Sequence, residues 1–250
     1  MIQIIFSLLA SCNSQNDSQS AEKVDDSIKV TQEIEMNDQK FHPELKSYIS
    51  SCNESFDEIS GERKTILDSL STYLNAITKD GKVAKLTFIC THNSRRSQMS
   101  QVWAAAAAHY YEVGEGIESF SGGTEATAFN PRAVEALERA GFEVDHPGGT
   151  NPPYDISFMN NGPVLKCFSK KYDDAYNPSE NFIAIMTCSD ADEACPIVRG
   201  AEARFSLPYE DPKAFDDTDQ EKAAYDERCK QIATELLYVF SNVKKRQKAI

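Results

Sequence analysis

The chain has 250 residues, 40% of them hydrophobic and 26% charged, which is enough for one sizeable core, and no apolar stretch in it is long enough to cross a bilayer. Its formal net charge of −13 argues against nucleic acid as a partner, because a polyphosphate binds surfaces rich in Lys and Arg. Its seven cysteines are too few and too scattered for a disulfide scaffold in a chain of this length.

The chain begins with a short apolar run, residues 1–12, that ends in Leu-Ala-Ser-Cys12. Small residues before a cysteine resemble a bacterial lipoprotein signal, which implies that Cys12 is lipidated. Residues 13–41 are rich in polar residues and are expected to be a disordered tether. We therefore expect a lipid-anchored protein of the cell envelope. The alternative is a cytoplasmic protein with a chance cysteine, because no Lys or Arg precedes the run.

The rest of the chain predicts an α/β fold. Apolar residues recur at helical spacing over residues 42–80, which indicates a helical extension. The main domain is expected over residues 84–245. Its predicted elements are a strand at 85–90, a helix at 97–113, a strand at 117–121, a helix at 130–140, a loop at 145–162, strands at 164–168 and 182–187, and a helix at 218–243. Strands that alternate with helices predict an open parallel sheet flanked by helices.

The first strand ends in Cys90, which begins the sequence Cys-Thr-His-Asn-Ser-Arg-Arg-Ser97. A loop of five residues can direct its backbone N–H groups at one tetrahedral oxyanion, and the helix that follows adds the positive end of its dipole. Arg96 can close this cradle with its planar fork, and the positive field favours the reactive thiolate of Cys90. The predicted oxyanion-binding residues are Thr91, His92, Asn93, Ser94, Arg95 and Ser97. The alternative is a strand-terminal cysteine followed by a basic turn.

A second cysteine pair follows the apolar run at 182–187. Cys188 comes directly after that run, and Cys195 lies seven residues later. Ligands in open α/β sheets bind beyond the carboxyl ends of the strands, so Cys90 and Cys188 are expected to face one site. A second thiol there can attack an adduct on the first, and a third can take over the disulfide. The alternative is two unrelated thiols in an acidic loop.

An Asp-Pro pair, Asp211-Pro212, precedes the last predicted helix. A carboxylic acid at such a loop can protonate a leaving oxygen. The alternative is a simple helix-entry turn, in which Asp before Pro is common.

Together and in this order, these pieces resemble the low-molecular-weight protein tyrosine phosphatase superfamily, and more closely its thioredoxin-coupled arsenate reductase branch. The resemblance covers about residues 84–243 and includes Ser121-Gly-Gly-Thr-Glu125 with Asn130-Pro131 beyond it. The cysteine loop is shared by both branches, whereas the Cys188 and Cys195 pair matches the reductases alone. The resemblance implies a low-molecular-weight phosphatase-like sheet for the main domain.

The resemblance also implies a first chemical step that both branches share. Cys90 attacks the oxyanion while Arg96 and the loop N–H groups hold its oxygens. Ser97 hydrogen-bonds the thiolate, and Asp211 protonates the departing oxygen. The substrate is then arsenate or a phosphate ester.

The second step separates the branches. In a reductase, Cys188 attacks the adduct on Cys90 and releases arsenite, Cys195 attacks Cys188, and an external thioredoxin-like dithiol reduces the resulting disulfide. In a phosphatase, water hydrolyses a phosphocysteine. No bound cofactor is implied, and no metal site is expected, because Gln101 replaces the acid that some reductases place near a potassium site.

Several positions depart from the family pattern. His92 stands where the family usually has Gly, and Arg95 stands where many members have a second cysteine, so its charge is expected to strengthen anion binding. The segment at 146–181 is longer than the family usually needs. The leading interpretation is an arsenate reductase. The alternatives are a phosphatase on the same scaffold and a non-catalytic surface lipoprotein that binds phosphate.

Overall fold

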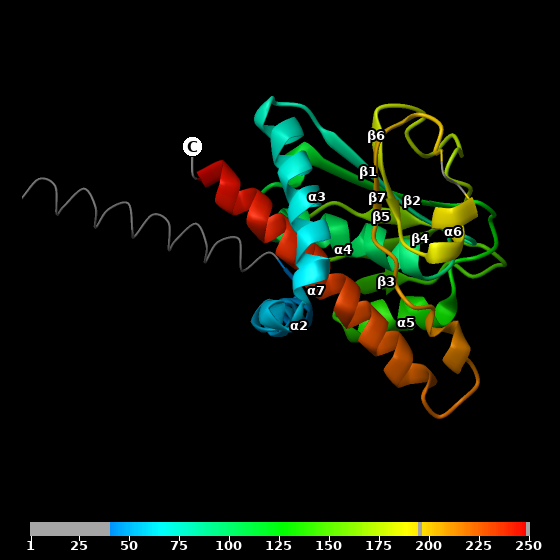
Figure 1. The fold of residues 1–250 in the computed structure, drawn as a ribbon. Helices are drawn as coiled ribbons and strands as arrows, with labels where there is room; N and C mark the ends of the chain where they lie inside the picture. The colour runs from blue at the N-terminus through cyan, green and yellow to red at the C-terminus, as the bar shows by residue number, and fades with distance from the viewer. Residues whose placement is uncertain (1–40, 195–196, 249–250) are drawn as a thin grey trace, which may run out of the picture. The chain divides into compact units, whose positions relative to one another are not determined.

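A parallel sheet of four strands lies at the centre of the computed structural model, which describes residues 41–194 and 197–248 (Figure 1). The strand order is β2-β1-β6-β7, and every pairing is parallel. The strands are β1 (Ala84–Cys90), β2 (Ile117–Gly123), β6 (Phe182–Met186) and β7 (Ala201–Ser206). The predicted open parallel sheet flanked by helices is confirmed.

The two central strands are the most apolar parts of the sheet. Every residue of β6 is buried, and all but one of β1 are buried, because helices cover both faces of a parallel sheet. The chain leaves β1 towards β2 on one side, while β6 pairs with β1 on the other. A switch point of this kind opens a crevice beyond the strand ends, and Cys90 is the last residue of β1.

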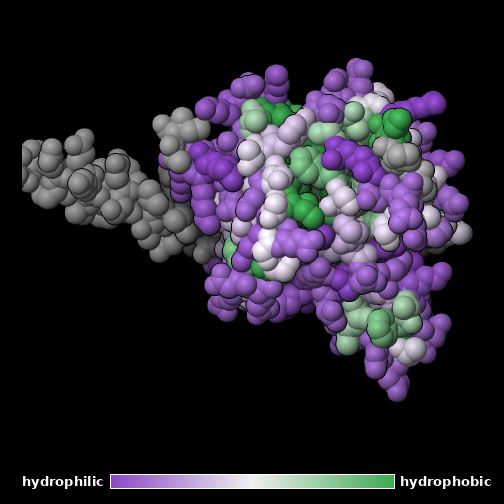
Figure 2. Space-filling view, viewed as in Figure 1, coloured by the Kyte–Doolittle hydropathy of each residue, from purple (hydrophilic) through white to green (hydrophobic). Residues whose placement is uncertain are grey.

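Helices of very different length flank the sheet. They are α2 (Pro43–Glu54), α3 (Gly61–Lys79), α4 (Arg96–Tyr110), α5 (Pro131–Arg139), α6 (Ser189–Ala194) and α7 (Glu221–Lys248), with 3-10 turns η1 (Phe56–Glu58), η2 (Gly114–Gly116) and η3 (Pro212–Phe215). The long helix α7 packs against α2, α3, α4 and α5, so the two N-terminal helices share one core with the sheet. No helix of the described residues is long and apolar enough to span a membrane. Figure 2 shows a mainly hydrophilic surface on one face, with scattered apolar side chains.

Helix α4 is buried from Arg96 to Ala108, and its alanine run explains how so much of it is enclosed. Alanine side chains end at Cβ, so β1, β2 and α7 can all pack closely on this helix. The same helix carries Trp103, whose ring stacks on Tyr48 of α2 with centroids 5.5 Å apart. Helix α4 therefore joins the sheet, α7 and the N-terminal helices, and it also carries Arg96 at its first position.

Three predicted features lie outside the described residues, two at the N-terminus and one in the second cysteine pair. These are the signal at 1–12 with Cys12, residues 13–40 of the tether, and Cys195. The last tether residue, Phe41, is described. It is buried, it pairs with Met159 in an isolated bridge, and its ring stacks on Phe158.

The prediction of a loop over residues 145–162 is wrong for the middle of that segment. Strand β4 (Tyr154–Ser157) lies there, between β3 (Glu143–Asp145) and β5 (Leu165–Cys167), in a small antiparallel sheet. Tyr154 and Ile156 are the buried positions of β4, and this two-residue alternation is too short to stand out among the Gly, Pro and Asn residues around it. The edge strand β7 and the short helix α6 also went unpredicted.

We expect Ala106→Leu to lower the free energy of unfolding by about 1–3 kcal/mol, because Ala106 is fully enclosed and added methylenes force its neighbours apart. Denaturant midpoints of the two proteins measure this change. Ala223→Leu, at an exposed position of α7, is the matched control and should be close to neutral. A neutral Ala106→Leu variant would contradict the tight packing of α4.

Candidate active site

In the loop between β1 and α4, the backbone carbonyls form hydrogen bonds, whereas the backbone N–H groups form none with the described residues. The carbonyl oxygens of residues 90–95 all accept hydrogen bonds. The donors are Thr124 N to Cys90 O (3.2 Å), Glu125 N to Thr91 O (2.8 Å), Ser169 Oγ to His92 O (2.9 Å), Gln98 Nε2 to Asn93 O (3.1 Å), Asn130 N to Ser94 O (2.9 Å) and Met99 N to Arg95 O (3.0 Å). Among the residues that the structure describes, none accepts a hydrogen bond from the N–H groups of residues 91–95. Free donors on one side of a turn form a nest for an anion.

Asn93 gives the loop its shape. Its φ is 46°, in the left-handed region, which reverses the chain within a few residues, and its side chain is buried. Its amide oxygen accepts from Lys170 N at 2.9 Å and from Gln98 Nε2 at 3.2 Å, and its amide nitrogen donates to Ser97 Oγ at 2.8 Å. This one side chain therefore joins the loop to α4 and to the segment after β5.

The same bond fixes the role of Ser97. Its Oγ lies 3.1 Å from Cys90 Sγ and already accepts a hydrogen bond from Asn93. The hydroxyl hydrogen of Ser97 is then left to point at the sulfur. Cys90 is only 4% exposed, so the sulfur lies at the bottom of the loop with a donor aimed at it.

Arg96 and Asp211 meet across the site. Arg96 Nη1 donates to the carbonyl of Tyr209 at 2.9 Å, and Nη2 donates to Asp211 Oδ2 at 2.8 Å. Its Nε is buried and has no hydrogen-bond partner among the described residues. The structure thus places the predicted acid on the predicted anion-binding arginine, and it leaves one donor of that arginine unused.

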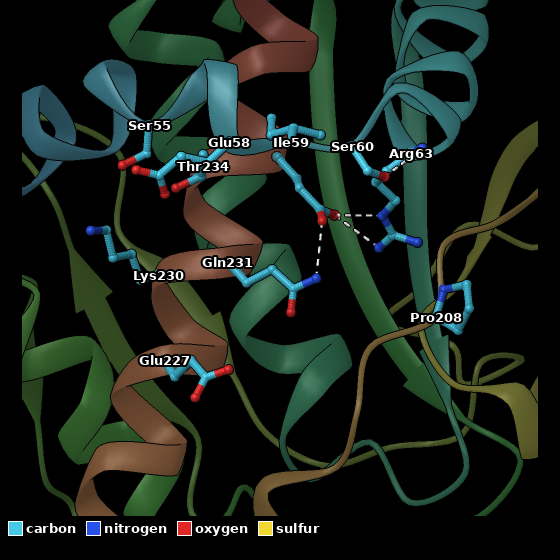
Figure 3. Close-up of a pocket in the computed structure, with 11 residues that line it drawn as sticks. Ser55, Glu58, Ile59, Ser60, Arg63, Pro208, Glu227, Lys230, Gln231 and Thr234 are labelled. Atoms are coloured by element: carbon cyan, nitrogen blue, oxygen red, sulfur yellow. Dashed lines mark hydrogen bonds and ion pairs between the residues drawn. The ribbon is translucent and has the colours of Figure 1, made fainter.

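A pocket of about 470 Å³ lies between η1, the start of α3 and α7, and Pro208 is part of its lining (Figure 3). Arg63 donates from Nε and Nη2 to Glu235 Oε2 at 3.0 and 2.8 Å, and its guanidinium lies 4.9 Å from the centre of the Tyr209 ring. Burial, together with Glu235, raises the pKa of Tyr209 well above its usual value. Arg63 and Glu235, the two most buried charged residues of this pocket, pair with each other. We therefore interpret the Arg63–Glu235 pair as a support for the Tyr209 ring. Because the Tyr209 carbonyl binds Arg96, the pair also supports Arg96. No pattern in the sequence predicts this contact.

Cys188 lies at the same edge of the sheet as Cys90. Its Sγ is 3.6 Å from Thr91 Oγ1 and accepts from Ala191 N at 3.4 Å. The side chain is fully buried. The structure therefore brings Cys188 beside the loop, while its predicted partner Cys195 is outside the described residues.

Arg95 is placed differently from the sequence expectation. Its side chain, expected to strengthen anion binding, donates to Tyr225 Oη at 2.7 Å and lies 3.3 Å from Asp216 Oδ2. Only its backbone N–H remains in the loop. His92 is exposed and lies 3.7 Å from Glu125, on the outer side of the same turn.

The long segment after β5 forms hydrogen bonds with the loop between β1 and α4. Ser169 Oγ donates to His92 O at 2.9 Å, and the backbone of Lys170 binds Asn93. A side chain at Gly123 would meet the carbonyls of Glu125 and Thr91 at 2.1 and 2.7 Å, so glycine is needed for this close approach. Nothing in the sequence pattern singled out Ser169 or Lys170.

Lys170 is almost fully buried, and its ammonium lies 4.7 Å from the ring centre of Phe168 and 5.4 Å from that of Tyr176. Burial lowers its pKa from 10.5 to about 8. The unfolded chain therefore binds more protons than the folded one between these values, and stability rises with pH across that window.

We expect Lys170→Met to remove this rise, with a gain over the parent of at most about 3 kcal/mol below pH 8 that shrinks to nothing near pH 10.5. Unfolding free energies measured from pH 7 to 10.5 test it. The exposed Lys171→Met is the control and should follow the parent at every pH. A gain that does not change with pH would contradict the lowered pKa.

Comparisons with known proteins identify a matching family model and several similar sequences. Residues 85–150 match the family model for low molecular weight phosphotyrosine protein phosphatases. The chain is 27% identical over 143 residues to an arsenate reductase from Bacillus subtilis, which covers 57% of this chain and 84% of that protein. It is 29% identical over 125 residues to arsenate reductase 2 from Staphylococcus haemolyticus, with 50% and 76% covered.

Solved structures similar to the chain include a low molecular weight phosphotyrosine phosphatase from Vibrio cholerae O395, with a TM-score of 0.42 and 14% identity over 67% of this chain and 99% of that one. Another is a YwlE mutant from Bacillus subtilis, with a TM-score of 0.43 and 15% identity over 66% and 99%.

Proposed function

Because the chain contains a domain of the low molecular weight phosphotyrosine protein phosphatase family and has arsenate reductases among its relatives, we propose that it is an arsenate reductase with Cys90 as its nucleophile. The observation that carries this proposal is the polarity of the loop at 91–95. Its carbonyls are bound on one side, and its N–H groups have no acceptor among the described residues. A loop of this kind suits a tetrahedral oxyanion above the sulfur.

In the first step, the Cys90 thiolate attacks arsenic and an As–O bond breaks. The leaving oxygen takes a proton from Asp211 and departs as water. Arg96 Nε and the loop N–H groups hold the remaining oxygens. The position of Asp211 supports its role as the acid, because Asp211 Oδ2 lies 2.8 Å from the Arg96 guanidinium; to give its proton, the carboxyl group must enter the step in its protonated form.

In the second step, the thiolate of Cys188 attacks the sulfur of Cys90. The S–As bond breaks, its electron pair stays on arsenic, and arsenite leaves as As(V) becomes As(III). Cys195 then attacks Cys188 and frees Cys90. An external dithiol of the thioredoxin type reduces the Cys188–Cys195 disulfide. The contact of Cys188 with Thr91 of the loop, at 3.6 Å, supports this order of events.

The alternative is a phosphatase that acts on a phosphoprotein or a small phosphate ester. The specific observation in its favour is that Cys90, Arg96 and Asp211 form a complete set without Cys188, which is fully buried. Water would then hydrolyse the phosphocysteine. Attachment to the cell envelope through Cys12 stays a prediction in either case, with a cytoplasmic location as its alternative.

We expect Cys90→Ser to lower both arsenate reduction and aryl phosphate hydrolysis at least about a thousandfold, because both need the same nucleophile. Arsenite formation with a thioredoxin system and release of a chromogenic phenol measure the two activities. Activity that survives this substitution would contradict both functions.

Cys188→Ser separates the two functions. It should stop arsenite release and leave aryl phosphate hydrolysis within about twofold of the parent, since only the reductase uses the second thiol. Cys52→Ala, which removes a buried thiol from α2, is the control for a change in the core. A parent protein that hydrolyses aryl phosphates but forms no arsenite would make the chain a phosphatase.

A further inference from the structure

We propose that Arg95 is a positioning residue that holds the far end of η3, so that the two consecutive arginines of the loop grip both ends of the turn that carries Asp211. This proposal rests on the proposed function in one respect, since it takes Asp211 as the proton donor. It replaces the expectation that the Arg95 side chain binds the substrate anion.

The near end of the turn is held through Asp211, which caps η3 (Pro212–Phe215). Its Oδ1 accepts from Lys213 N at 3.1 Å, and its Oδ2 accepts from Arg96 at 2.8 Å. Both carboxylate oxygens are therefore engaged, and the carboxyl group has one orientation relative to the loop.

The far end is held through Asp216, the residue that follows η3. Arg95 Nη2 lies 3.3 Å from Asp216 Oδ2, and Arg95 Nε donates to Tyr225 Oη at 2.7 Å. Tyr225 Oη in turn donates to Asp216 Oδ1 at 2.8 Å. The three side chains close a ring of contacts in which each touches the other two. The side chains of Arg95 and Asp216 are only 12% and 18% exposed, so solvent weakens these contacts less than it weakens surface pairs.

The turn between Asp211 and Asp216 packs against α7, but most of its side chains are exposed. Lys213, Ala214 and Phe215 are exposed, and only Pro212 is buried. Arg132 also approaches Asp216, at 3.8 Å, but its shorter contacts are with Asp217 and Glu221, at 2.6 Å each. The position of Asp211 thus depends on two neighbouring residues at the start of α4.

The experiment compares Arg95→Met, Asp216→Asn and the parent protein on aryl phosphates whose leaving phenols range from acidic to weakly acidic. An acidic phenol departs without help, whereas a weakly acidic one needs the proton from Asp211. We expect kcat/KM of each variant to fall about tenfold for the least acidic phenol and to stay within about twofold for the most acidic one. Asp211→Asn, which removes the proton donor, shows how strongly kcat/KM depends on the leaving phenol when no acid assists it. Inhibition by inorganic phosphate should be unchanged.

Two further variants and a double-mutant cycle distinguish the loss of this contact from a general loss of folding. Arg95→Lys keeps the charge and should recover part of the activity on the poor leaving group. The double variant of Arg95→Met and Asp216→Asn should lose little more than either single one, because both break the same contact. Arg132→Gln is the matched control and should behave as the parent. An equal loss for every leaving group, with weaker inhibition by phosphate, would overturn the proposal in favour of anion binding by Arg95.

Amide hydrogen exchange of residues 211–216 gives a readout that needs no turnover. Exchange there should become faster in Arg95→Met than in the parent, with the core of α4 unchanged. Unchanged exchange in the turn would overturn the proposal whatever the activities are. Faster exchange without any leaving-group dependence would retain the grip by Arg95 but overturn the role of Asp211. A parent protein with no Cys90-dependent turnover would overturn the proposed function alone.

Discussion

The site depends on one constraint, which is that the chain must reverse direction at Asn93 while all its carbonyls stay outside. A φ of 46° costs most side chains about 1–2 kcal/mol, and Asn tolerates it better than most because its amide can bond locally. Here the amide is also buried and binds Ser97, Gln98 and Lys170. Asn93 therefore links three features: the strained backbone, the direction of the Ser97 hydroxyl and the position of the Lys170 backbone. A change at Asn93 alters all three.

Support for the loop comes from both sides of the region that matches the family model. Arg63 of α3, which precedes that region, lies on the ring of Tyr209, and the Tyr209 carbonyl binds Arg96. Ser169, which follows it, binds His92 from the segment after β5. The helices at residues 43–79 and the long segment between β5 and β6 therefore contribute to the geometry of the loop, and a fragment limited to residues 85–150 would lack both supports.

The sequence predicts those parts of this arrangement that are local. Strands β1 and β6 are apolar because both faces are buried, and the loop after β1 has its donors within eight residues. The contacts of Ser169 with His92 and of Arg96 with Tyr209 join residues 77 and 113 positions apart, and no pattern in one sequence marks such pairs. The placement of the Arg95 side chain could not be predicted for a related reason. Its charge is evident in the sequence, but the partners that compensate it, Asp216 and Tyr225, are set by how α7 and η3 pack.

The distinction between reductase and phosphatase also has a structural consequence around Cys188. Helix α6 occupies the six residues between Cys188 and Cys195. Six helical residues rise about 9 Å, whereas a disulfide joins Cα atoms less than about 7 Å apart. The cysteine relay proposed for the reductase therefore involves this helix. Ala191 of this helix is buried in the same apolar cluster as Cys90 and Cys188, and Asp192 pairs with Arg204 of β7. The phosphatase needs no second thiol, so only the reductase depends on the residues of α6 and on Cys188.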